Sequence, residues 1–170
     1  MRLLSLKDIT SIKPFDCGDS DLNEFLLVDA KFYEEQYLAH TYVLEDDEET
    51  VAFFGVLNDK VSQTEVDKSL WRKLRRTIPH EKHYDSYPAV KIGRLAVSSK
   101  HKGKDIGTTI IMAIRTKLGA NVEYSACRFL TVDAYKEVKD FYIKNGFLPL
   151  TKEIPEDQPT IPMYFDLKAI

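Results

Sequence analysis

Residues 89–111 read AVKIGRLAVSSKHKGKDIGTTII, and this stretch decides how the chain is interpreted. Residues 89–97 are apolar and rich in branched side chains, which predicts a strand. Gly93 inside that strand indicates a bulge or a close approach by another group. A short basic loop, 98–105, follows. From Asp105 to about residue 118 the apolar side chains recur every four positions and predict an amphipathic helix; they are Ile106, Ile110, Ile114 and Leu118.

The order of strand, basic loop and helix predicts an anion site. The first N–H groups of a helix have no partner within it and lie at the positive end of the helix dipole. A loop that directs further N–H groups to the same point can hold a phosphate or a pyrophosphate. The glycines, lysines and hydroxyl that would serve such a site are Gly103, Gly107, Lys102, Lys104 and Thr108. The alternative is an ordinary lysine-rich surface turn in front of a helix.

This stretch resembles the acetyl-CoA loop of the GNAT N-acetyltransferases, whereas the dinucleotide fingerprint and the P-loop pattern are both absent from it. The GNAT pattern is Arg or Gln, two residues, Gly, one residue, and Gly or Ala, after a strand that ends much like Leu95-Ala96-Val97. In this chain Lys102 stands at the Arg or Gln position. Asp105 stands at the position of the first Gly, and Gly107 stands at the position of the second. Lysine keeps the charge, but Asp105 brings a carboxylate and a Cβ close to the expected pyrophosphate. Turned outward, that carboxylate would favour the start of the helix.

A second block extends the resemblance. We expect a buried strand over 128–134 and a short helix over 136–145, and a strand–helix–strand order favours a parallel pair with a right-handed crossover. The sequence Phe141-Tyr142-Ile143-Lys144-Asn145-Gly146-Phe147 is similar to the family's Phe/Leu-Tyr-x-x-x-Gly-Phe ending. Tyr135 and Val138 depart from the residues usual in the family. Residues 147–150 and 162–167 are predicted to close the sheet as an antiparallel pair.

The resemblance implies one GNAT domain over residues 1–170, of mixed α/β (α+β) class. Its fold would be a central mixed, mostly antiparallel sheet with two splayed parallel strands, flanked by helices. It also implies an acetyl-CoA-dependent N-acetyltransferase in which a primary amine attacks the thioester directly. The residues expected to bind acetyl-CoA are Leu95, Ala96, Val97, Lys102, Gly103, Lys104, Asp105, Ile106, Gly107, Thr108, Tyr135, Phe141 and Tyr142.

Tyr142 is the residue that the resemblance implies as the catalytic acid. A phenol of pKa ~10 is close enough to a thiol to share a proton with the departing CoA thiolate; the alternative is core packing. A backbone N–H between Gly93 and Leu95 could stabilise the oxyanion, and no general base is assigned. The candidate contacts to the acceptor are Arg94, Tyr87 and Asp133. Arg94 fits a structural ion pair equally well, and Tyr87 belongs to an expected loop over 78–88.

Composition narrows the class of protein. The chain has 170 residues, 30% of them charged, and a net charge of −3, which favours a single globular domain and argues against a generic nucleic-acid binder. No apolar run approaches the ~18 residues of a membrane span, and a secretory signal is not evident. With two cysteines lacking metal-ligand spacing, we expect reduced thiols in the cytoplasm. His80 and His83 have no evident third ligand, so no metal site is predicted.

The amino-terminal sequence bears on the acceptor. Phe15-Asp16-Cys17-Gly18, followed by Leu22-Asn23-Glu24-Phe25-Leu26, resembles the opening of a GNAT subgroup that includes toxins acetylating aminoacyl-tRNA. These relatives pair with a small antitoxin, so an antitoxin-like partner is compatible, as is a homodimer. A small amine, a protein amine and an aminoacyl-tRNA all stay open as acceptors. A predicted helix over 64–76 carries a basic cluster that is either a solvated face or a site for an acidic partner such as tRNA. Asp105 also leaves open a non-catalytic domain that binds CoA or a partner.

Overall fold

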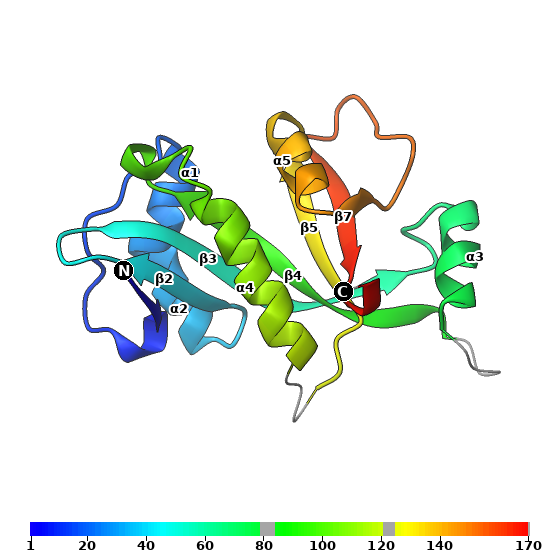
Figure 1. Cartoon of the computed structure of the whole chain (residues 1–170), viewed down its shortest axis with the longest axis horizontal. Coiled ribbons are helices and arrows are strands. Elements are labelled where there is room, and N and C mark those ends of the chain that lie inside the picture. Colours follow the sequence, from blue (N-terminus) through cyan, green and yellow to red (C-terminus); the bar gives the residue numbers. More distant parts are fainter. Residues whose placement is uncertain (79–83, 121–124, 170) are drawn as a thin grey trace. The chain divides into compact units, whose positions relative to one another are not determined.

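The structure is a computed structural model that describes residues 1–78, 84–120 and 125–169. Helices and strands are interspersed along the chain (Figure 1). The strands are β1 (Arg2–Ser5), β2 (His40–Glu45), β3 (Thr50–Ser62), β4 (Ser86–Val97), β5 (Phe129–Tyr135), β6 (Leu148–Pro149) and β7 (Thr160–Asp166). The helices are α1 (Ser20–Glu24), the π-helical turn η2 (Phe25–Asp29), α2 (Ala30–Glu35), α3 (Lys68–Arg76), α4 (Ile106–Ala120) and α5 (Lys139–Lys144). Short 3₁₀ turns are η1 (Leu6–Asp8), η3 (Ser99–His101), η4 (Lys136–Val138) and η5 (Leu167–Ala169).

The strands form a mixed sheet in the order β1-β2-β3-β4-β5-β7-β6. The pairs β1–β2, β2–β3, β5–β7 and β6–β7 are antiparallel, whereas β4 and β5 are parallel neighbours. The predicted mixed α/β class and the closing antiparallel pair are therefore confirmed. The splaying of the parallel strands and the single domain over 1–170 stay predictions. Within the described ranges, no helix is both long and apolar enough to cross a membrane.

The chain divides into two compact units. The first unit comprises Met1–Leu57 and Ile92–Ile114, and the second comprises Asn58–Lys91 and Arg115–Ile170. Strands β3 and β4 and helix α4 each pass from one unit into the other. The basic loop lies in the first unit, and Tyr142 lies in the second.

The first unit packs its amino-terminal helices against strands through aromatic side chains. The Phe25 and Phe53 rings stack with centroids 6.1 Å apart, and Phe15 meets Phe53 edge to face at 5.4 Å. All three are at most 8% exposed. Asp19 caps α1, because its carboxylate accepts from the N–H groups of Asp21 and Leu22.

The second unit is built on an aromatic core beneath α3. The Trp71 ring lies 5.3 Å from that of Tyr87, which in turn lies 6.4 Å from Phe129. The expectation that Tyr87 stands in a loop was wrong: it belongs to β4 and is 6% exposed. Packing against Trp71 accounts for its place. Helix α3 begins at Lys68, later than predicted. His80 and His83 lie outside the described residues.

Candidate functional site

The basic loop after β4 is anchored to the amino-terminal segment and to β3. The Ser98 N–H donates to the Val51 carbonyl at 2.8 Å, and the Ser99 N–H donates to the Asp16 carbonyl at 2.9 Å. The Lys102 ammonium donates to the Cys17 carbonyl at 2.8 Å. The Phe-Asp-Cys-Gly opening therefore holds this loop in place.

That opening is itself held by a small hydrogen-bond network. One Asp16 carboxylate oxygen accepts from the Gly18 N–H and from the Asn23 amide, each at 2.8 Å. The Asn23 side-chain oxygen, Oδ1, accepts from the Cys17 N–H at 3.0 Å. The Gly18 N–H and then the Asn23 amide hold the pKa of Asp16 below its usual range. Gly18 has a φ of 81°, which explains a glycine there.

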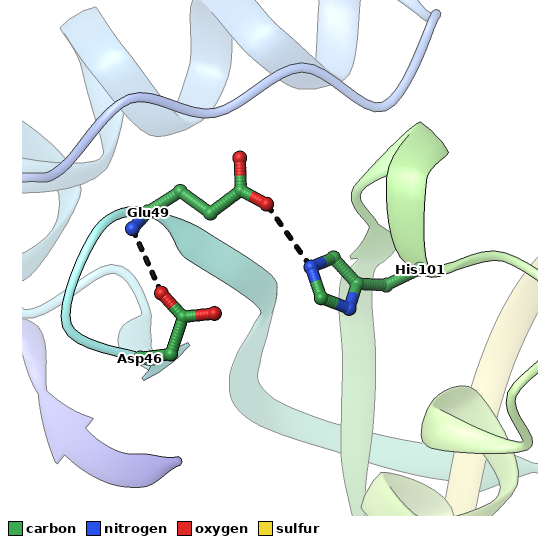
Figure 2. A group of neighbouring side chains, drawn as sticks. All are labelled: Asp46, Glu49 and His101. Carbon is green, nitrogen blue, oxygen red and sulfur yellow. Dashed lines mark hydrogen bonds and ion pairs between the residues drawn. The ribbon is translucent and has the colours of Figure 1, made fainter.

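The β2–β3 hairpin holds the basic loop through a second set of contacts (Figure 2). Glu49 accepts from the Lys100 ammonium at 2.6 Å and lies 3.0 Å from Nε2 of His101. These two hydrogen bonds lower the pKa of Glu49. An Asp46 carboxylate oxygen accepts from the N–H groups of Glu48 and Glu49, both at 2.9 Å. The hairpin therefore fixes the same loop from another direction.

Asp46, Glu49 and His101 each offer a ligand atom within 4.8 Å of the others, which is close enough for a metal ion. Their carboxylates already have donors, however. Lys100 occupies one Glu49 oxygen and His101 the other, and two hairpin N–H groups occupy one Asp46 oxygen. We interpret the group as a clamp on the loop.

The loop then bends sharply into α4. Gly103 has a φ of 76° and Asp105 a φ of 55°, so both residues lie in the left-handed region. The Asp105 carbonyl accepts the first helical hydrogen bond, from Thr109 N–H at 3.0 Å. A Cβ on Gly103 would meet no atom within 4 Å. The open turn and the first N–H groups of this 15-residue helix together fit a phosphate group.

The left-handed backbone of Asp105 explains why the GNAT pattern has a glycine at this place. Glycine adopts a positive φ without cost, whereas aspartate tolerates it better than most other residues do. Asp105 is also exposed. The departure from the pattern therefore keeps the shape of the loop and adds one negative charge beside it.

We predict that Asp105→Gly binds acetyl-CoA roughly two- to fivefold more tightly, because the exposed Asp105 carboxylate repels the phosphates and two like charges ~4 Å apart in water interact by up to about 1 kcal/mol. Asp105→Asn is the matched control, because it removes the charge and keeps the Cβ. Calorimetric titration measures both. An equal gain in affinity for the two variants would identify the charge of Asp105 as the cause. Weaker binding of acetyl-CoA by Asp105→Gly would contradict a phosphate site at this turn.

The two loop lysines that are expected at the anion site, Lys102 and Lys104, each lie beside a protein group in this structure. The Lys102 side chain is turned to the Cys17 carbonyl, and its contact to phosphate stays a prediction. The Lys104 ammonium lies 3.5 Å from Nδ1 of His101. Lys104 is exposed, while Ile106, Gly107 and Thr108 are half-buried at the start of α4.

The end of β4 carries the remaining candidates of the first unit. Ala96 is buried in the core, and Leu95 and Val97 are half-buried. A Cβ on Gly93 would lie 2.7 Å from a methyl carbon of Leu57, which confirms the predicted close approach. The Arg94 guanidinium stacks 3.9 Å from the Phe25 ring centroid, a cation–π contact.

In the second unit, Tyr142 lies in α5 and is 6% exposed. Its ring meets Phe141 at 5.1 Å and Phe147 at 5.5 Å, both edge to face. Burial raises the pKa of Tyr142 to about 12. This corrects the expectation of an unshifted phenol: the group is a weaker acid than a thiol of pKa ~8.5. A phenol in this state can donate a hydrogen bond more readily than it gives up its proton.

A raised pKa keeps the Tyr142 hydroxyl protonated, and the protonated form is the one that donates. Activity that needs this form is complete below the ordinary tyrosine pKa of about 10 and is lost only as pH rises through about 12. We predict that kcat shows no alkaline decline below pH ~10. A decline centred near pH 9 at saturating substrates contradicts this role.

The carboxyl end of α5 is well fixed. The Asn145 amide donates to the Phe141 carbonyl at 2.8 Å. Arg115 donates to the Asn145 carbonyl at 3.2 Å, and its guanidinium lies 3.7 Å from the Phe165 ring centroid. Gly146 follows with a φ of 85°, and a Cβ there would lie 3.1 Å from Phe165. The glycine of the tyrosine motif is thus required by backbone and packing.

The other candidates of the second unit lie on or beside β5. Asp133 pairs with Lys91 at 2.9 Å, and Lys91 also lies 3.6 Å from Asp59. Although burial acts to lower it, the pKa of Lys91 is raised by these carboxylates. Tyr135 is exposed at the strand end, and Phe141 is half-buried. We missed Asp59 from the sequence, because nothing local marks a residue whose partners are distant in the chain.

Both the sequence and the fold of this chain are similar to those of known acetyltransferases. A family model described as an acetyltransferase (GNAT) domain matches residues 81–165. Three similar solved structures each cover 99% of this chain. One is a bacterial toxin, 17% identical, with 92% of its chain covered and a TM-score of 0.79. A tyrosine-to-phenylalanine mutant of KacT is 21% identical, with 95% covered and a TM-score of 0.79. AtaT complexed with acetyl-methionyl-tRNAfMet is 20% identical, with 95% covered and a TM-score of 0.78.

Proposed function

The chain belongs to the GNAT acetyltransferase family and is an acetyl-CoA-dependent N-acetyltransferase, and from this premise we propose that its acceptor is the amino group of an aminoacyl-tRNA. Two observations support this acceptor. The Phe-Asp-Cys-Gly opening is the part of the sequence that resembles the tRNA-acetylating subgroup, and here it anchors the loop through Asp16 and Cys17. AtaT, a protein of the same fold, has been solved with acetyl-methionyl-tRNAfMet.

The observation that most supports binding of acetyl-CoA is the turn from Gly103 into α4, which the preceding contacts hold in place. In the proposal, N–H groups over residues 103–108 hold the pyrophosphate of acetyl-CoA. The main chain of Leu95 and Val97 pairs with the pantetheine amides in the manner of an added strand. Ala96 contributes through its backbone, since its side chain is buried.

Tyr142 acts on the leaving group in this proposal. The amine nitrogen attacks the thioester carbonyl carbon and forms the carbon–nitrogen bond, while the carbon–sulfur bond breaks and the sulfur takes up negative charge. The proton that the nitrogen loses passes to water, and the thiolate takes up a proton from water after it departs. A protonated Tyr142 stabilises that charge by donating a hydrogen bond. No described residue accepts a hydrogen bond from its hydroxyl, so the group is available to do so. Tyr135 and Phe141 are proposed to flank the pantetheine arm, and Arg94 and Asp133 to contact the acceptor.

An acceptor screen tests the proposal. Isotope-labelled acetyl-CoA is supplied with charged tRNA, deacylated tRNA, a peptide and a panel of small amines. We expect label in N-acetylaminoacyl nucleosides released by nuclease from the charged tRNA alone. Label in the peptide or the small amines, with charged tRNA unlabelled, contradicts the proposed acceptor while leaving acetyl transfer intact.

The proposal extends to location and partners. AtaT has been solved with its antitoxin AtaR and acetyl-CoA. By analogy we propose a cytoplasmic protein of one GNAT domain that forms a homodimer and binds an antitoxin-like protein. Co-expression with the product of a neighbouring gene, followed by light scattering of the purified complex, measures both partner and stoichiometry.

A further inference from the structure

Helix α3 carries an unusual concentration of positive charge. Its sequence, KSLWRKLRR, contains five cations and no acid, in a chain whose net charge is −3. Trp71 and Leu74 are buried and face the core of the second unit. The cations exposed on the remaining surface are Lys68, Arg72, Lys73 and Arg76. The helix is therefore apolar on one side and predominantly basic on the other, where Ser69 is the one uncharged exposed residue.

None of these four side chains pairs with a carboxylate among the described residues. Arg72 donates only to the Lys68 carbonyl, at 3.3 Å. Two cations elsewhere in the second unit do have acidic partners: Lys91 pairs with Asp133, and Arg128 pairs with Asp166 at 2.8 Å. The basic face of α3 thus gathers, on one helix surface, four cations that have no carboxylate partner among the described residues.

Like charges four residues apart destabilise a helix, and here Lys68, Arg72 and Arg76 follow one another at that spacing. The helix dipole favours cations only in the last turn. It accounts for Lys73 and Arg76 but not for Lys68 and Arg72. A face that keeps this repulsion suits a partner rich in negative charge.

We propose that the exposed face of α3, made of Lys68, Arg72, Lys73 and Arg76, binds the phosphate backbone of the RNA acceptor. This rests on the proposed function, since aminoacyl-tRNA is the polyanion that the enzyme must hold. Arginine and lysine on successive turns of one helix can follow a row of phosphates without reading bases. Such contacts bind different tRNAs alike and leave the acetylated amino acid to be selected elsewhere.

The anchoring of α3 allows its outer face to be changed without disturbing the fold. The Thr77 hydroxyl donates to the Leu74 carbonyl at 2.7 Å and closes the helix. The Lys152 N–H donates to the Asp67 carboxylate at 2.8 Å, just before the helix begins. None of these contacts uses a side chain of the basic face.

The experiment compares Arg72→Gln/Lys73→Gln/Arg76→Gln with a charge-matched control, Lys7→Gln/Lys31→Gln/Lys168→Gln, whose residues are likewise exposed. Binding of deacylated tRNA is measured by anisotropy at several salt concentrations, and kcat and KM are measured with charged tRNA. We expect the α3 variant to reduce the slope of log K against log salt by about 2, at ~0.7–0.9 per lost phosphate contact, and to raise KM with kcat unchanged. The control should match the wild type in both.

An unchanged slope and an unchanged KM in the α3 variant overturn the proposal, and the basic face would then suit an acidic protein segment. An equal loss in both variants also overturns it, since only net charge would matter. A slope that depends on α3, in an enzyme that acetylates no charged tRNA, keeps the RNA contact and rejects the proposed acceptor. The experiment therefore distinguishes a failure of the proposed RNA contact from a failure of the proposed acceptor.

Discussion

Tyr142→Phe is expected to lower kcat by about 100- to 1,000-fold, the loss that follows removal of one hydrogen-bond donor to a charge that develops in the transition state. The change deletes one oxygen from a side chain whose ring is packed between Phe141 and Phe147. The ring contacts persist in phenylalanine, so we expect the affinity for acetyl-CoA and the melting temperature to stay close to those of the wild type. Thiol release measures kcat, and titration calorimetry measures affinity.

Tyr164→Phe is the matched control for this prediction. Tyr164 is also buried in the second unit, and burial also raises the pKa of its phenol. It has no proposed role in the reaction. We expect its kcat to stay within about threefold of the wild type, because the lost oxygen meets no reacting group. A Tyr142→Phe enzyme that is as active as this control would remove Tyr142 from the mechanism.

Gly107→Glu is expected to weaken acetyl-CoA binding by about 100-fold. Gly107 lies in the first turn of α4, where the proposal places the pyrophosphate. A carboxylate there repels the phosphates, and two like charges ~4 Å apart near a protein surface interact by up to ~4 kcal/mol. The fold should persist, since an acidic residue in the first turn favours the helix dipole.

Gly107→Gln separates charge from size, because glutamine has nearly the shape of glutamate. We expect Gln to weaken binding about tenfold less than Glu does, as the neutral amide only crowds the site. Calorimetry with acetyl-CoA gives the affinities, and circular dichroism checks the helix. Wild-type affinity in Gly107→Glu would show that the diphosphate is held elsewhere.

The strand, loop and helix of the central stretch could be predicted because their signals are local. Apolar periodicity predicted α4, and β4 contains the expected strand. The tyrosine motif likewise placed Tyr142 in a short helix that ends before Gly146. Residue spacing within about 20 positions carries this information.

The supports of the loop could not be predicted, because they come from far along the chain. Asp16 and Cys17 reach the loop from more than 80 residues away, and Glu49 from about 50. The orientation of the Lys102 side chain could not be predicted either, because its partner, the Cys17 carbonyl, is distant in the sequence. Tyr87 was misplaced because its packing on Trp71 is a tertiary interaction, which no local pattern encodes.

A structure of the protein crystallised with acetyl-CoA tests the central claim most directly. We predict phosphate oxygens within hydrogen-bonding distance of N–H groups over residues 103–108, and the Tyr142 hydroxyl within reach of the thioester sulfur. A diphosphate bound away from the start of α4, or a Tyr142 hydroxyl that points away from the sulfur, would contradict the account.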